Sequence, residues 1–166
     1  EGAAALGLGG GKVALTDDAS AISHNPANLT ELKNAQILPA VTFIHADTEF
    51  ISPMGSAKTE DPWKILPNVF GAWPIENTRY VAGVGITTPF GQSTVWEQSS
   101  ALRYVAPYSA SMTLIDVNPT LAARLTDRLS VGVGADVYWS RLEMKQKLPW
   151  SALTGSPLSP DGTIHA

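Results

Sequence analysis

The sequence of 166 residues contains no cysteine. This absence excludes disulfide bonds, thiolate metal sites, iron–sulfur clusters and cysteine nucleophiles. Charged residues are also scarce, at 16% of the chain, and the net charge of −4 leaves no basic footprint for nucleic acid or anionic lipid. No apolar run approaches the roughly 18 residues that a membrane-spanning helix requires. What the sequence does contain is organised in two regions.

The first 33 residues differ from all that follow. Residues 2–11 read GAAALGLGGG, which is too rich in glycine for a stable helix. Asp17 or Asp18 can then cap the start of a short helical turn. Asn25-Pro26 should end that turn, because the residue before a proline is disfavoured in the helical region. We therefore expect residues 1–33 to form a separate segment of short helices and irregular chain.

From residue 34 to residue 166 the apolar period changes to two, which predicts strands. Five strands are expected, over 36–50, 66–75, 80–88, 115–125 and 129–140. Gly83 and Gly85 weaken the third strand and favour a bend or a close backbone approach. Pro119 cannot donate to a sheet, so the fourth strand should contain a bulge or a locally broken pair. Short turns at 76–79 and 126–128 alternate with long loops at 51–65, 89–107 and after Leu148.

The strand 129–140 places six apolar residues on one face and a small and polar set, which includes Tyr138, on the other. The apolar face carries aliphatic side chains with Trp139 at one end, whereas the opposite face is mainly serine, glycine and aspartate. A membrane β-barrel, with lipid outside and water inside, has this pattern. A soluble or surface-exposed β-sandwich with one buried face would alternate too, and it is the alternative. Five strands would leave two open edges, which hydrocarbon does not tolerate, so we expect the chain to be part of a larger barrel.

Three groups of residues in order along the chain resemble one family. Gly2–Gly11, Asp17-Asp18-Ala19-Ser20 and Asn25-Pro26-Ala27-Asn28-Leu29-Thr30 are similar to the N-terminal hatch of the FadL family of outer-membrane transport proteins. Thr88-Pro89-Phe90-Gly91 is similar to the family's segment at the end of its third strand. The stretch from Asp116-Val117-Asn118-Pro119 to Leu129-Ser130-Val131-Gly132 resembles its next hairpin.

The resemblance implies an all-β fold, an antiparallel transmembrane barrel of fourteen strands. Residues 1–33 would be its hatch or plug, and 34–166 its first five strands with long extracellular loops. The implied function is passive transport of long-chain fatty acids or aromatic hydrocarbons across the outer membrane of a Gram-negative bacterium. The solute would leave sideways through the wall, where Gly83 and Gly85 kink the third strand beside Asn25, Pro26 and Ala27 of the plug.

The same resemblance implies an extracellular apolar groove, for which the loop 89–107 offers few residues. The candidates for contact with substrate are Val95, Trp96, Leu102, Tyr104 and Val105. Trp63, Trp96 and Trp150 lie in the expected loops and could contact substrate or simply pack there. The expected partners are hydrophobic small molecules and outer-membrane lipid, not nucleic acid, and the protein is expected to be a monomer without cofactor or metal.

Catalysis is not expected, although several residues invite the question. Ser20 and His24 have helical spacing and could indicate an acyl hydrolase, but the Gly-x-Ser-x-Gly elbow of such enzymes is missing. His24 is expected to be a polar plug residue hydrogen-bonded to the barrel wall. Asp17 and Asp18 are expected to cap a helix. Asp116 and Asp136 could bind a cation, or pair with basic residues of the plug.

Overall fold

The computed structural model describes residues 7, 13, 14, 16–53, 55–60, 62–97, 104, 107–155 and 161–166. These residues divide into two compact units. Unit 1 comprises Glu1–Thr42, Leu66–Pro89 and Ile115–Trp139, and unit 2 comprises Phe43–Ile65, Phe90–Leu114 and Ser140–Ala166. The predicted segment Gly2–Gly11, apart from Gly7, lies outside the described residues.

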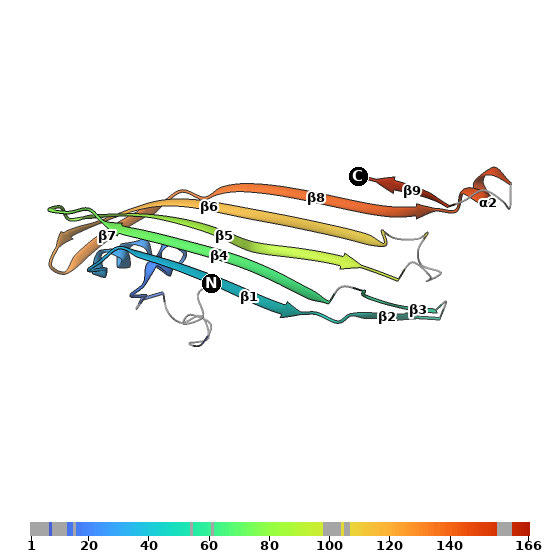
Figure 1. Ribbon diagram of the computed structural model, residues 1–166, viewed down its shortest axis with the longest axis horizontal. Coiled ribbons are helices and arrows are strands. Elements are labelled where there is room, and N and C mark those ends of the chain that lie inside the picture. Colours follow the sequence, from blue (N-terminus) through green and yellow to red (C-terminus); the bar gives the residue numbers. More distant parts are fainter. Residues whose placement is uncertain are drawn as a thin grey trace. The chain divides into compact units, whose positions relative to one another are not determined.

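Strands dominate the described part of the chain (Figure 1). In chain order the elements are the 3-10 helices η1 (Ala19–Ser23) and η2 (Pro26–Glu31), then β1 (Gln36–His45), β2 (Glu49–Ser52), β3 (Gly55–Lys58), β4 (Trp63–Pro74), β5 (Tyr80–Val95), β6 (Ser109–Thr126), β7 (Leu129–Gly134), β8 (Val137–Leu148), α2 (Trp150–Thr154) and β9 (Gly162–His165). The hydrogen-bonded order of the larger sheet is β1-β4-β5-β6-β8-β9, and β7 also pairs with β6. No described helix is long and apolar enough to cross a membrane.

All five predicted strands are present, but several bounds were wrong. The first strand ends at His45 instead of residue 50, and the expected loop 51–65 contains part of the antiparallel hairpin β2–β3. The third strand, β5, continues to Val95 through a stretch predicted as loop. Gln92, Ser93 and Thr94 are polar and give that stretch no alternation of apolar and polar residues. The sequence pattern therefore does not indicate a strand there.

The strand predicted over 129–140 is interrupted at Ala135 and Asp136 and forms β7 and β8. The interruption lies opposite Pro119: Thr120 pairs with Gly134, and the backbone N–H of Ala135 donates to the carbonyl of Pro119 at 3.1 Å. Because proline has no N–H to return, the regular ladder stops there. This agrees with the break expected at Pro119.

In unit 1 the apolar parity of β7 and of the start of β8 is exposed. Val131, Val133 and Val137 have exposed fractions of 45%, 68% and 60%. A β-sandwich would bury these side chains against a second sheet. Their exposure agrees with the expectation that this face contacts lipid.

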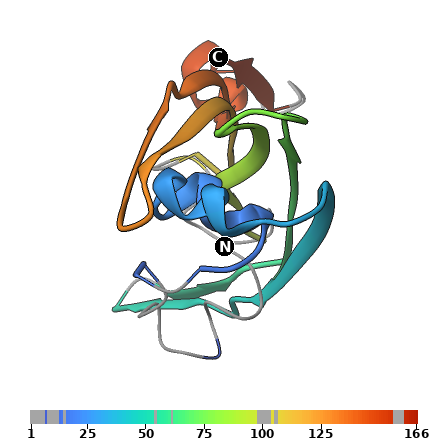
Figure 2. The same ribbon diagram turned by 90° about the vertical axis from the view of Figure 1, so that its left-hand side faces the viewer.

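The opposite face of the unit 1 strands packs against residues 16–32, called here the helical segment. Figure 2 shows the two 3-10 helices on the concave side of these strands. The buried core joins side chains of both partners: Ala19, Ala21, Ile22, Leu29 and Leu32 from the helical segment, and Phe70, Ala72, Val81 and Ala122 from β4, β5 and β6. Fully burying a side chain such as Phe70, with 0% exposed, stabilises by roughly 1.5–3 kcal/mol.

Unit 2 consists of strand ends and short connections. In the β2–β3 hairpin, Lys58 and Glu49 pair across the ladder with an ion-pair distance of 3.9 Å. The chain after β8 forms α2, which ends at Gly155 with a left-handed φ of 69°, and then returns as β9 to pair with β8. The long loop expected after Leu148 therefore contains a helical turn and a strand.

Candidate functional site

The helical segment begins as its sequence predicts. Asp18 is the N-cap of η1, and one of its carboxylate oxygens accepts from the backbone N–H of Ser20 at 2.9 Å and from its hydroxyl at 2.5 Å. This bond engages the hydroxyl of Ser20 with a carboxylate, so the Ser20–His24 pair of an acyl hydrolase does not form. η1 ends before Asn25, and η2 starts at Pro26, as expected from the Asn-Pro dipeptide.

One side of the helical segment fits over two glycines of β5. The nearest atoms to a Cβ placed at Gly83 or Gly85 belong to Ile22, at 3.0 Å and 3.1 Å. The wall has no side chain at these positions, so the Ile22 side chain can lie directly on the backbone. On the β4 side the pairing with β5 runs through both glycines without a shift of register, with Phe70 opposite Gly85 and Ala72 opposite Gly83.

The other side of the segment is held by β6 and β7. A Cβ placed at Gly132 would lie 2.5 Å from the backbone nitrogen of Ala27. Pro26 and Ala27 therefore pack directly against the backbone of β7 at Gly132. Two polar contacts flank this approach. The Thr30 hydroxyl donates to the Ser130 hydroxyl at 2.8 Å, and Arg124 donates to the Thr30 carbonyl at 2.6 Å and pairs with Glu31 at 2.9 Å.

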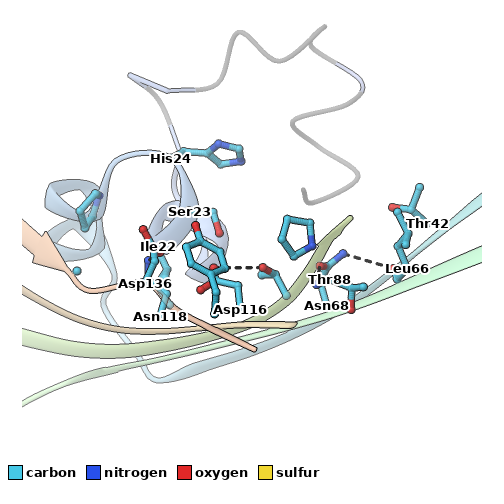
Figure 3. A pocket seen from close by; sticks show the side chains of 15 residues that line it. Ile22, Ser23, His24, Thr42, Leu66, Asn68, Thr88, Asp116, Asn118 and Asp136 are labelled. Atoms are coloured by element: carbon cyan, nitrogen blue, oxygen red, sulfur yellow. Dashed lines mark hydrogen bonds between the residues drawn. The ribbon is translucent and has the colours of Figure 1, made fainter. Parts of the chain in front are cut away.

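A cavity of about 650 Å³ lies between the helical segment and the strands, entirely within unit 1. Its volume is in the range of small-molecule sites. Figure 3 shows side chains of the segment and of the strands gathered around it. Its lining residues are Ile22, Ser23, His24, Pro26, Thr42, Leu66, Asn68, Thr87, Thr88, Pro89, Asp116, Asn118, Gly134, Asp136 and Tyr138.

Two carboxylates line this cavity, and no lysine or arginine is among the described lining residues. Asp116 is only 8% exposed. One of its oxygens lies 3.5 Å from the Thr87 hydroxyl, and the other, Oδ1, is buried and has no hydrogen-bond partner among the residues that the structure describes. Asp136 accepts from the side-chain amide of Asn118. The alternative that plug residues pair with these carboxylates finds no support among the described residues.

His24 also lines the cavity, but not as expected. Its Nε2 is buried and has no hydrogen-bond partner in the described part of the chain, so the predicted bond from this nitrogen to the wall is absent. No group of three or more histidine, aspartate or glutamate side chains that could hold a metal occurs among the described residues.

The structure separates the gate residues predicted from the sequence into two contacts. Pro26 and Ala27 approach Gly132 of β7, whereas Gly83 and Gly85 of β5 face Ile22. Asn25 donates from its side-chain amide to Asn28 at 3.3 Å, within the helical segment. The prediction that these five residues form an exit for solute is not tested by this arrangement.

The predicted loop contacts fall in unit 2. Val95 ends β5, and its carbonyl accepts from the N–H of Glu60 at 2.8 Å, while Trp96 forms an isolated bridge with Thr59. The Tyr104 hydroxyl donates to the carboxylate of Asp161 at 2.9 Å. Leu102 and Val105 lie outside the described residues. Trp63 begins β4 and Trp150 begins α2, each about half exposed.

Sequence reasoning did not single out several residues of this site. Arg124 is a lone basic residue on the polar parity of its strand, and Thr87 shares the inward parity of Gly83 and Gly85, so both carried a usable signal. Gly132 belongs to the stretch that resembles the family's hairpin, but nothing in that stretch indicated its contact with Pro26 and Ala27. Ile22 carried no signal, because its role depends on contact with residues far away in the sequence.

Comparison with known proteins assigns the family. Residues 3–164 match the sequence model of the family described as outer membrane protein transport protein (OMPP1/FadL/TodX). The chain is 28% identical over 141 residues to the long-chain fatty acid transport protein of Salmonella typhi, covering 82% of this chain and 32% of that protein. It is 30% identical over 93 residues to the 47 kDa outer membrane protein of Pasteurella multocida, covering 55% of this chain and 22% of that protein.

A solved structure agrees with this result. The fold is similar to the crystal structure of a Pseudomonas aeruginosa FadL homologue, with a TM-score of 0.69, 18% identity, and coverage of 94% of this chain and 42% of that chain. The chain spans about a third of the length of the fatty acid transport protein from Salmonella typhi. It belongs to the FadL family of outer-membrane transport proteins of Gram-negative bacteria.

Proposed function

We propose that the protein containing this chain passively transports hydrophobic compounds, fatty acids or aromatic hydrocarbons, across the outer membrane. The relatives named as fatty acid transporters support this proposal. In it, residues 1–33 are the plug and 34–166 the first strands of a closed, monomeric barrel. Transport down a gradient requires no catalytic step and no cofactor.

Release would occur sideways through the wall at β5, with the plug as the gate. The observation that carries this proposal is the fit of Ile22 over Gly83 and Gly85. The contact of Ile22 with these glycines is apolar, whereas close backbone packing at Gly132 and polar contacts with Ser130 and Arg124 hold the segment on β6 and β7. The helical segment could therefore stay attached to β6 and β7 while it moves away from β5. This movement would expose the backbone of β5 at Gly83 and Gly85.

An engineered disulfide between the plug and β5 tests this mechanism. The chain has no cysteine of its own. A Cβ at Gly85 would lie 3.1 Å from Cγ2 of Ile22. The Cβ of Ile22 is one bond further on and is not among the atoms within 3.5 Å, so the two Cβ atoms lie near the separation of about 3.5–4.5 Å found in disulfides. The double variant Ile22→Cys/Gly85→Cys would be made in the full-length protein, in cells lacking other uptake of a radiolabelled fatty acid or hydrocarbon.

Oxidation should reduce uptake to the level of cells without the protein, and a reductant should restore it. The two single-cysteine variants serve as controls and should not respond to oxidation. Unchanged uptake by protein shown to be cross-linked would contradict gating at this contact. Uptake equal to background in the unmodified protein would contradict the transport function itself.

The soluble β-sandwich alternative gains no support from the described residues. It requires the apolar face of β7 and β8 to be covered by protein, and Val131, Val133 and Val137 are exposed.

A further inference from the structure

The second half of β8, together with β9, carries a face rich in basic side chains. The two strands are antiparallel, and their register places Lys145 opposite His165 and Lys147 opposite Thr163. Side chains of opposed residues lie on the same face of a sheet, and so do those of alternate residues along a strand. This face, called here the basic face, comprises Arg141, Glu143, Lys145, Lys147, Thr163 and His165.

Contacts between side chains agree with this placement. Arg141 and Glu143 form an ion pair at 2.5 Å, and Lys147 Nζ lies 3.4 Å from the hydroxyl of Thr163. Among the described residues of the basic face, three cations therefore accompany one carboxylate, although the whole chain has a net charge of −4. The overall charge predicted no basic footprint for anionic lipid, but strand pairing produces one.

The basic face continues the side of β8 that the proposed barrel turns to lipid. Val137 and Trp139, on this side, are 60% and 55% exposed. Tyr138, between them, has the opposite parity and lines the cavity beside the helical segment. Arg141 follows Trp139 by two residues and therefore has the parity of the exposed side. Apolar side chains give way to basic ones directly after Trp139.

The lengths of the connections place the basic face toward the cell surface. Short turns join β4 to β5 and β6 to β7, whereas β5 and β6 are joined through residues 96–108. In outer-membrane barrels the long loops are extracellular, and aromatic residues mark both boundaries of the apolar band. β8 runs away from the short turns, so Trp139 marks the outer boundary and Arg141 lies beyond it.

The depth over which the positive charges are spread indicates the kind of lipid. Arg141 and Lys147 are six residues apart, which is about 20 Å along a strand and about 15 Å along the membrane normal at the usual tilt. The headgroup layer of a phospholipid bilayer is only about 5–8 Å thick on each side. Lipopolysaccharide, the glycolipid of the outer leaflet in Gram-negative bacteria, carries phosphates on its lipid anchor and on the sugars above it. Its anionic groups therefore extend over the depth that the basic face covers.

We infer that the basic face binds the phosphate groups of lipopolysaccharide in the outer leaflet. Arg141 binds phosphates next to the acyl chains, and Lys145 and Lys147 bind phosphates on the sugars further out. Hydrogen bonds from arginine and lysine to phosphate are strong because both partners are charged. Glu143 competes with phosphate for Arg141. This binding requires the barrel of the proposed function, but none of its transport steps.

Energy transfer from tryptophan to dansyl-labelled lipopolysaccharide tests this contact. The full-length protein would be reconstituted in phosphatidylcholine vesicles that contain a small fraction of the labelled lipid, and unlabelled competitors would displace the label. Lipopolysaccharide should compete on the order of tenfold better than its dephosphorylated form or phosphatidylglycerol, because only its phosphates reach all three cations. Inorganic phosphate should displace the label no better than sodium chloride of equal ionic strength.

Two variants should change the affinity in opposite directions. Arg141→Gln/Lys145→Gln/Lys147→Gln should weaken lipopolysaccharide binding on the order of 100-fold, since each basic residue near an anionic surface contributes about fivefold. Glu143→Gln should strengthen binding, because it removes a negative charge that repels phosphate and pairs with Arg141. Heat-modifiable migration on gels checks that each variant folds.

The matched control is Lys33→Gln/Arg79→Gln/Arg128→Gln, which removes the same charge from exposed positions outside the basic face and should bind like the unmodified protein. Equal competition by dephosphorylated lipopolysaccharide, by phosphatidylglycerol or by inorganic phosphate would overturn the inference. So would a folded triple variant of the basic face that binds like the control, or an unchanged affinity in Glu143→Gln. Absence of fatty acid and hydrocarbon uptake by a protein that binds lipopolysaccharide as expected would contradict the transport function alone.

Discussion

At the scale of single residues, close approaches rather than strong bonds position the helical segment. Gly132 leaves no room for a side chain beneath Pro26 and Ala27. The neighbouring ion pair between Arg124 and Glu31 is partly exposed, at 39% and 66% of the two side chains, and such pairs contribute only about 0–1 kcal/mol. The shape of the wall therefore matters more than its charge at this contact.

Gly132→Ala should displace the helical segment from the wall. The added Cβ would overlap backbone atoms of Pro26 and Ala27, which cannot rotate away as a flexible side chain could, and overpacking of this kind costs about 1–3 kcal/mol. We expect faster cleavage of the segment by added protease and a larger ion conductance of the full-length protein in planar bilayers.

Gly162→Ala is the control for this substitution. The nearest atom to its new Cβ would be Leu148 Cβ at 3.6 Å, an ordinary contact. Equal protease sensitivity of the two variants would argue against the close approach at Gly132.

At the scale of elements, strand alternation identifies which face of β7 is exposed. Leu129, Val131 and Val133 share the exposed parity, and Ser130 and Gly132 contact the helical segment. The alternation of apolar and polar residues in the sequence therefore predicts which face of β7 is exposed and which face contacts the helical segment. The chemical character of the exposed environment is then a question for experiment.

Val133→Arg should destabilise the full-length protein if this face contacts lipid. Arginine on the lipid face costs roughly 2–4 kcal/mol near the bilayer midplane and much less near the interface. The free energy of unfolding in lipid vesicles, measured by denaturant titration, would report the cost.

Asp127→Arg, on the turn between β6 and β7, provides the comparison and should change the free energy little. A Val133→Arg protein as stable as Asp127→Arg would show that Val133 does not lie in hydrocarbon.

At the scale of the whole molecule, this chain matches only part of the length of its relatives. It covers 32% of the fatty acid transport protein of Salmonella typhi and 42% of the Pseudomonas aeruginosa FadL homologue. An open sheet edge in lipid would leave backbone groups without partners, so the strands described here require further strands beside them. Closure of the barrel is therefore part of the proposal for the full-length protein.

The full-length protein should therefore require detergent for extraction and migrate faster on gels before boiling than after it. A closed barrel resists unfolding by the gel detergent until it is heated, because all its strand hydrogen bonds are satisfied internally. Extraction into buffer without detergent, with no change of migration on boiling, would contradict the barrel architecture.

The sequence alone was sufficient for features that depend on neighbouring residues. Asp18 caps η1, Pro26 starts a new helix, Pro119 interrupts the ladder, and period two locates the central part of each long strand. Each of these signals depends on the local backbone preference of a few residues. The ends of β5 and β6 were missed because their polar residues pair through backbone groups, which carry no side-chain pattern.

Only the tertiary structure decided how the helical segment meets the wall. Thr30 and Ser130 are 100 residues apart. Ile22 lies on Gly83 and Gly85, and Pro26 and Ala27 lie on Gly132. The cavity that joins Asp116, Asp136 and His24 likewise draws on strands that are distant along the chain. Such contacts result from packing in three dimensions, where the fit of one surface on another is fixed by shape and no local propensity encodes it.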